Sequence, residues 1–184
     1  EQGVSAPVTV IPTGIDAAKF QNGNGLRMRA ELGIPDSAFV IGHVGRLAPE
    51  KNLELLTEAL TRFVNANAAA HVVVAGQGPL SDHMLSAFEV IGRSANLHML
   101  GPVTGSRLAD VYAAMDVFAF SSHSETQGLV LAEAMAAGVP VVALDAFGAR
   151  EIVSDTRNGR LLAANTSAAQ FCAGLAWIEK CPPL

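Results

Sequence analysis

Cysteine, aromatic residues and charge are all scarce in this chain of 184 residues. It has only two cysteines, Cys172 and Cys181, and no histidine cluster completes a zinc-binding pattern with them, which argues against a zinc site. Phenylalanine, tryptophan and tyrosine make up 5% of the residues, too few for a stacking surface for single-stranded nucleic acid. The formal net charge of −5 also argues against non-specific nucleic-acid binding, which needs a basic face.

Long apolar runs are missing as well. None approaches the roughly 18–20 residues that a membrane span requires. The chain starts at Glu1 without the basic residues and apolar run of a signal peptide. We therefore expect a cytoplasmic location and reduced thiols rather than a disulfide. Because the chain lacks an initiator methionine, we expect it to be part of a longer protein.

Apolar residues nevertheless make up 50% of the chain, as short runs separated by stretches with helical periodicity. Strands are predicted at residues 39–44, 71–75, 96–100, 117–121, 139–143 and 160–162. Helices are predicted at residues 52–66, 81–91, 107–114, 129–137, 149–153 and 166–179. Asn52 is expected to cap the first of these helices, and Gly138 to end the fourth.

The predicted strands are near-continuously apolar rather than alternating, as in parallel sheets that are buried on both faces. Their alternation with helices indicates βαβ units. The predicted fold class is therefore α/β, a doubly wound, Rossmann-like parallel sheet of about six strands flanked by helices. Residues 1–38 are less regular, with a short strand expected at 8–11, a turn at 12–16 and a loop at 21–25. We expect them to be a linker packed on the domain, which covers residues 39–184.

In such a sheet, ligands bind beyond the carboxyl ends of the strands. The first strand is followed by Gly45, Arg46 and Lys51. Two cations beside a helix start suit a diphosphate, and Gly45 lets the backbone approach it. The alternative is an exposed basic turn that pairs with Glu50.

The second strand ends in a Gly-x-Gly turn, Gly76 to Gly78. The dinucleotide fingerprint needs a third glycine three residues later, and this position holds Ser81. An NAD-binding site is therefore disfavoured. The glycines contact a ligand or form a tight strand-to-helix turn, and the sequence does not decide between the two.

The segment that follows the fourth predicted strand is the most informative. Glu125 is expected in the loop before the helix, and Glu133, eight positions later, on its second turn. A carboxylate in so apolar a helix needs a partner, such as a ligand hydroxyl, a backbone group or an arginine. Gly128 and Leu129 would present amides to an anion at the helix start.

Taken in order, Arg46, Lys51, the Gly76–Gly78 turn, the Glu125 and Glu133 pair and the Gly-x-Pro before the fifth strand resemble a known family. They are similar to the C-terminal, donor-binding half of retaining glycosyltransferases of the GT-B fold, in glycosyltransferase family 4. This family includes bacterial enzymes that transfer mannose or glucose to lipids and polysaccharides. The resemblance covers residues 10–162, and residues 12–16 resemble the family's linker into this half.

The resemblance implies that a UDP- or GDP-sugar binds between two Rossmann-like halves. It implies that Arg46 and Lys51 contact the diphosphate, with support from the amides near Gly128 and Leu129. Glu133 matches the acid that holds the ribose hydroxyls, and Glu125 the acid at the donor sugar. The resemblance also places Gly45, Gly76 and the turn at 101–103, which includes Val103, in the donor site. It implies that backbone groups of this turn contact the base. The implied catalytic residues are Glu125, Arg46 and Lys51.

The implied chemistry needs fixed cations and amides to stabilise the charge that grows on the leaving diphosphate. No Asp-x-Asp pair occurs, in agreement with a metal-free mechanism, and no cofactor is expected. Family members retain the anomeric configuration by front-face attack, with the leaving phosphate as base. Many of them have Phe where this chain has Gln127, and the variant resembles a subset that includes glycolipid enzymes. The acceptor is then a lipid or glycan, held by an N-terminal half outside this chain, and the longer protein could associate peripherally with membranes.

Three alternatives stay open at this point. They are an NAD-dependent oxidoreductase, a GT-B relative that is not a transferase, such as a sugar-nucleotide epimerase or a glycan phosphorylase, and a non-catalytic binding module. Among the histidines, His123 is expected to bond to backbone at a strand end. The others on strands, His43, His71 and His98, are expected to pack in the core.

Overall fold

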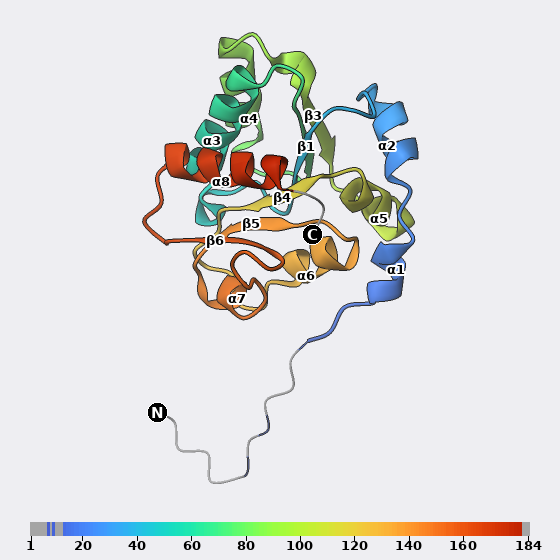
Figure 1. Cartoon of the computed structure of the whole chain (residues 1–184), viewed down its shortest axis with the longest axis vertical. Coiled ribbons are helices and arrows are strands. Elements are labelled where there is room, and N and C mark those ends of the chain that lie inside the picture. Colours follow the sequence, from blue (N-terminus) through green and yellow to red (C-terminus); the bar gives the residue numbers. More distant parts are fainter. Residues whose placement is uncertain (1–6, 8, 10–12, 182–184) are drawn as a thin grey trace.

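The six strands predicted from the apolar runs all form, and they build a parallel sheet in the order β3-β2-β1-β4-β5-β6 (Figure 1). This computed structural model describes residues 7, 9 and 13–181. The strands are β1 (Val40–Val44), β2 (His71–Ala75), β3 (Leu97–Gly101), β4 (Val117–Phe120), β5 (Val141–Leu144) and β6 (Gly159–Leu162). The predicted doubly wound α/β fold is confirmed.

Every predicted helix is present, with small shifts at the ends. The helices after β1 are α3 (Leu53–Ala66), α4 (Ser81–Val90), α5 (Gly105–Ala113), α6 (Leu129–Ala136), α7 (Phe147–Arg150) and α8 (Ala168–Lys180), with 3-10 turns η1 (Pro49–Lys51) and η2 (Ser94–Asn96). Gly138 ends α6 as expected, with φ of 79° and its N–H donating to Met135 O. Among the described residues, none of the helices has the length and apolar character that a bilayer crossing requires.

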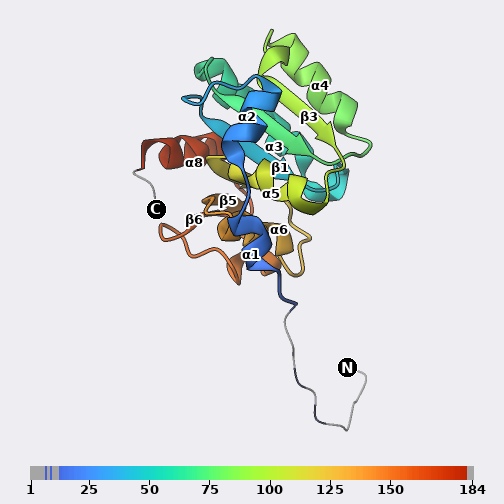
Figure 2. The ribbon, with the colours of Figure 1, turned by 90° about the vertical axis from the view of Figure 1, so that its right-hand side faces the viewer.

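Two hydrophobic cores lie on the two faces of the sheet. The larger aromatic residues Phe20, Tyr112 and Phe118 belong to the core beneath α1 (Ala17–Gln21), α2 (Gly25–Leu32), α5, α6 and α7. The other core joins the sheet to α3, α4 and α8 and contains Phe88 and Phe171. Figure 2 shows α1, α2, α5 and α6 in front of the strands. The apolar strand residues are buried because helices cover both faces.

The helices α1 and α2 were not predicted within the irregular first 38 residues. Each is short, but each has a capping residue, since Asp16 and Asn24 accept hydrogen bonds from backbone N–H groups at the helix starts. Phe20 of α1 packs edge-to-face on Tyr112 of α5, with ring centroids 5.6 Å apart. Helices of five and eight residues are too short for periodicity to reveal, so tertiary packing stabilises them.

The loop expected at 21–25 is shorter in the structure and covers residues 22–24, because Gln21 ends α1 and Gly25 begins α2. The two glycines of this stretch have a packing role. A Cβ on Gly23 would lie 2.2 Å from Ala109 O, and one on Gly25 would lie 2.1 Å from Ala113 O. Residues 17–32 therefore lie tightly against α5. The expected strand at 8–11, apart from Thr9, and the first residue of the expected turn at 12–16 lie outside the described residues. The division at residue 38 stays a prediction.

Candidate functional site

The strand order reverses between β1 and β4. The chain runs outward from β1 through β2 to β3 and then returns to form β4 on the other side of β1. The crevice beyond the carboxyl ends of two such strands is the usual ligand site of open α/β sheets. Lys51 follows β1 and Glu125 follows β4, so both lie at this edge.

The structure brings these two predicted residues into direct contact. Lys51 Nζ donates to Glu125 Oε2 at 3.1 Å, and the two side chains are 24% and 18% exposed. The N–H of Gly128 donates to the other carboxylate oxygen at 3.2 Å. Burial opposes ionisation of the carboxyl group, but Lys51 and the N–H groups of Gly128 and Gln127 outweigh it and hold the pKa of Glu125 below its usual value. The ion pair is therefore intact at neutral pH.

Hydrogen bonds from the loop after β4 fix the turn that holds Lys51. Ser121 Oγ donates to Lys51 O at 2.7 Å, and Ser124 Oγ donates to Glu50 O at 3.2 Å. Asn52 Nδ2 and His123 Nε2 are 3.1 Å apart. The acid loop is held in turn by α7, because Gly148 N–H donates to Glu125 O at 3.0 Å.

Two expectations about this region were wrong. Asn52 occupies the N-cap position of α3, but its φ is 53° and its side chain makes no capping bond, because it faces His123 instead. Correspondingly, His123 bonds to a side chain rather than to backbone. In this structure the N–H of Gly128 donates to Glu125 Oε1, and its predicted contact with an anion stays a prediction.

Arg46 lies on the same turn but is more exposed. Its side chain is 71% exposed and pairs with Glu50 at 3.5 Å, which is the contact weighed as the alternative to a diphosphate site. An exposed pair of this kind contributes little to stability, so Arg46 can turn to another anion at small cost. The structure thus leaves one predicted cation tightly paired and the other loosely paired.

An open pocket of about 430 Å³ lies next to Arg46, at the carboxyl ends of β1, β2 and β3. Its lining includes the predicted residues Gly45, Gly76 and Val103. The glycines also have a packing role, because a Cβ on Gly76 would lie 1.8 Å from Gly45 O and one on Gly78 would lie 2.2 Å from Leu47 O. The Gly-x-Gly turn is therefore required for close approach of two turns, whatever it binds.

Glu133 has a partner that the sequence did not identify. Tyr112 Oη on α5 donates to Glu133 Oε2 at 2.8 Å, and no arginine or backbone contact of this carboxylate is present among the described residues. Burial, together with the nearby carboxylate, raises the pKa of Tyr112. The sequence contained a signal for this contact, because a buried tyrosine hydroxyl needs a hydrogen-bond partner and the chain has one tyrosine.

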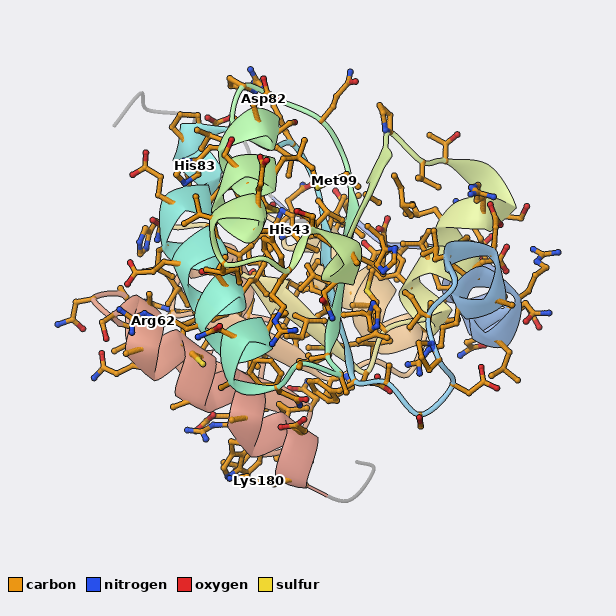
Figure 3. All side chains as sticks on the ribbon, turned by 90° about the horizontal axis from the view of Figure 1, so that it is seen from above. His43, Arg62, Asp82, His83, Met99 and Lys180 are labelled. Atoms are coloured by element: carbon orange, nitrogen blue, oxygen red, sulfur yellow. The ribbon has the colours of Figure 1, made fainter. Side chains whose placement is uncertain are left out.

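His43 is packed in the core as expected, whereas His71 and His98 are only partly buried. His43 Nδ1 lies 3.0 Å from Ala119 O, a bond in which the ring nitrogen donates, and its ring is buried. Figure 3 shows His43 in the middle of the molecule, whereas Arg62, His83 and Lys180 lie on the outer helices. His71 and His98 face each other on β2 and β3. Cys172 and Cys181 are both free. Within the described residues, no three histidine, cysteine or acidic side chains gather as a metal-ligand set.

Comparison with known proteins identifies relatives of the whole domain. Residues 26–184 match the family described as "Glycosyl transferases group 1". A D-inositol 3-phosphate glycosyltransferase of Segniliparus rotundus is 35% identical over 159 residues, which cover 84% of this chain and 35% of that protein. The GDP-mannose-dependent alpha-mannosyltransferase of Mycobacterium tuberculosis is 35% identical over 149 residues, which cover 81% and 36%. The chain therefore spans about a third of the length of these relatives.

Solved structures agree with this fold. Anabaena HepE in complex with UDP and glucose superposes with a TM-score of 0.79 and 25% identity over 91% of this chain and 46% of that one. The C-terminal domain of the group 1 glycosyl transferase LpcC from Francisella tularensis gives a TM-score of 0.80, 24% identity and coverage of 91% and 89%. With the family match over residues 26–184, these findings show that the chain belongs to the glycosyl transferases of group 1.

Proposed function

We propose that this chain is the donor-binding half of a retaining glycosyltransferase of family 4. It binds a nucleoside-diphosphate sugar and, together with an N-terminal half, transfers the sugar to a lipid or glycan acceptor. The observation that carries this proposal is the ion pair between Lys51 and Glu125, with 3.1 Å between Nζ and Oε2, at the reversal of strand order. Ligands of open α/β sheets bind at this position. In the proposal, the cation binds the phosphate of the ligand and the carboxylate binds its sugar.

The charged residues of the β1 turn have the chemistry that the reaction needs. Negative charge grows on the leaving diphosphate as the glycosidic bond breaks, and fixed donors stabilise it most effectively when they are in place beforehand. In this proposal Lys51 and Arg46 contact the diphosphate, and Glu125 contacts the donor sugar. The backbone of the Lys51 turn is fixed by Ser121, which supports such preorganisation.

The nucleoside is assigned to the pocket beside Arg46. Its lining by Gly45, Gly76 and Val103 leaves backbone groups close to a bound base. Glu133 would accept hydrogen bonds from the ribose hydroxyls, with Tyr112 holding its carboxylate in position. Both nucleotides that the relatives suggest remain in the proposal, because one relative is named for GDP-mannose and HepE was solved with UDP.

An oxidoreductase is the less favoured reading. The strand order is shared with dinucleotide-binding folds, but Ser81 replaces the third glycine of the fingerprint and the family match is to glycosyl transferases. Neither an epimerase nor a simple binding module has a specific observation in its favour. We also propose a cytoplasmic location, at the membrane surface where the acceptor is a lipid.

Calorimetric titration of the purified chain with UDP, GDP and NAD tests the proposal. We expect one of the two nucleoside diphosphates to bind and NAD not to bind. A panel of nucleoside-diphosphate sugars, compared by the rise in melting temperature, then identifies the base and sugar. Absence of binding by both diphosphates at millimolar concentration would contradict the proposed function.

A further inference from the structure

Glu125 takes the two contacts that a phosphate group would take in the proposed donor site. One carboxylate oxygen accepts from Lys51 Nζ at 3.1 Å, and the other accepts from Gly128 N–H at 3.2 Å. A cation and a helix-start amide are the donors with which proteins commonly bind phosphate. In this structure both are satisfied by an acid of the chain itself.

The backbone on both sides of this ion pair is fixed. Lys51 O accepts from Ser121 Oγ at 2.7 Å, and Glu125 O accepts from Gly148 N–H at 3.0 Å. A Cβ on Gly148 would lie 2.9 Å from Glu125 O, so these segments are in close contact. An arriving diphosphate therefore meets the donors through movement of the Lys51 and Glu125 side chains, rather than through opening of the loops.

The two ion pairs at this edge differ in exposure. At the more buried pair, an arriving anion has to replace Glu125 as the partner of Lys51 rather than share Lys51 with it. Arg46 and Glu50 are 3.5 Å apart and 71% and 47% exposed, so water screens them. Lys51 and Glu125 are 24% and 18% exposed, so the charge of Glu125 acts more strongly on whatever approaches Lys51. A second anion cannot share Lys51 with the carboxylate without repulsion.

We propose that Glu125 takes the place of the donor's terminal phosphate before the nucleotide binds and yields this place when it binds. This inference rests on the proposed function. Exchange of partners turns Lys51 to the phosphate and frees the Glu125 carboxylate for the sugar, so that the acid becomes available only when a diphosphate is present. The same exchange lowers the affinity for nucleoside diphosphates and favours release of the spent nucleotide.

Calorimetry on Glu125→Gln tests the exchange, with whichever of UDP and GDP binds the unmodified chain. Glutamine keeps the size of the side chain and an oxygen that accepts from Gly128, but it does not hold Lys51 by charge. We expect the diphosphate to bind about tenfold more tightly, as loss of one charge-assisted competitor implies. The corresponding nucleoside, which has no phosphate, should bind Glu125→Gln and the unmodified chain equally.

Two matched variants separate exchange from net charge. Glu50→Gln makes the same change in charge on the same turn, and we expect it to raise affinity less than about threefold, as for an exposed pair. In a Lys51→Met background, Glu125→Gln should raise affinity no further. A wild-type measurement that depends on no variant is the amide resonance of Gly128, which should shift with the diphosphate and stay in place with the nucleoside.

The inference is overturned if Glu125→Gln binds the diphosphate no more tightly than the unmodified chain, or if Glu50→Gln gives the same gain. It is also overturned if the Gly128 resonance does not respond to the diphosphate. These results leave the proposed function intact, provided that the unmodified chain binds the nucleotide. Failure of the unmodified chain to bind either diphosphate would instead contradict the proposed function and the inference together.

Discussion

Lys51 and Glu125 are 74 positions apart in the chain, yet Nζ and Oε2 are 3.1 Å apart in the structure. The contact joins the turn after β1 to the loop after β4, the two neighbouring strands between which the sheet order reverses. Hydrogen bonds from Ser121 and Ser124 to the backbone of the same turn accompany it. The predictions below follow from this edge of the sheet and from the helices that support it.

Lys51→Met should weaken binding of the nucleoside diphosphate by about 10- to 100-fold, since a hydrogen bond to a charged group is worth about 1.5–3 kcal/mol. Lys180→Met is the matched control, because Lys180 lies on the outer helix α8 (Figure 3). Titration calorimetry on both variants measures the difference. Equal affinities in the two variants would exclude Lys51 from the site.

Glu133→Ala should lower the free energy of unfolding by about 1–3 kcal/mol, because the buried hydroxyl of Tyr112 loses its acceptor. Glu133→Gln keeps an acceptor oxygen and should cost less. If Glu133 holds the ribose, the glutamine variant should still bind the nucleotide more weakly than the unmodified chain. Urea denaturation gives the stabilities, and an equal loss of stability in the two variants would contradict a stabilising hydrogen bond from Tyr112 to Glu133.

Gly78→Ala should lower the free energy of unfolding by about 1–3 kcal/mol, since its Cβ would lie 2.2 Å from the backbone oxygen of Leu47. Gly14→Ala, with open space around the position, is the control and should be close to neutral. Thermal melting of both variants in the absence of nucleotide makes the comparison. A loss that is seen only with nucleotide bound would assign Gly78 to the ligand rather than to packing.

Stability should decrease as the pH falls from about 7 to 5. Burial lowers the pKa of His43, and the positive charge of Lys51 lowers it further. The hydrogen bond to Ala119 O raises the pKa, but by less than burial lowers it. As the pH falls below about 6.5, the unfolded chain takes up a proton that the folded chain does not, so the free energy of unfolding decreases. Burial lowers the pKa of His71 and His98 in the same direction.

His43→Leu should reduce this dependence by at most about 1.4 kcal/mol per pH unit. The variant also loses the bond to Ala119 O, so its slope with pH, rather than its absolute stability, is the quantity to compare. His83→Gln changes an exposed histidine on α4 and is the control. An unchanged slope in His43→Leu would show that His43 does not titrate as inferred.

The purified chain should bind the donor but transfer sugar poorly. Efficient transfer needs a second half to close the site and exclude water from the reacting centre. The chain spans about a third of the length of its curated relatives, and in the proposed function the second half supplies the surface opposite the donor site. Assays that detect both transfer and donor hydrolysis measure this, and efficient transfer by the chain alone would be the contrary result.

Local patterns in the sequence were sufficient for the fold class. The apolar runs at β1 to β6 and the helical spacing between them predicted the doubly wound sheet, and Gly138 correctly predicted the end of α6. The helices α1 and α2 escaped prediction, because they are too short to show periodicity and depend on contacts with α5. Asn52 was assigned to helix capping from its position alone, whereas its side chain faces His123.

The sequence by itself determined which chemical groups follow which strand, because strand and helix periods are properties of neighbouring residues. Only the tertiary structure decided that Lys51 meets Glu125, that Tyr112 meets Glu133, and that Gly128 donates to Glu125. These contacts join residues whose distance depends on strand order, helix packing and the path of a loop. No local pattern encodes that distance, which is why the types of residue at the site could be predicted and their partners could not.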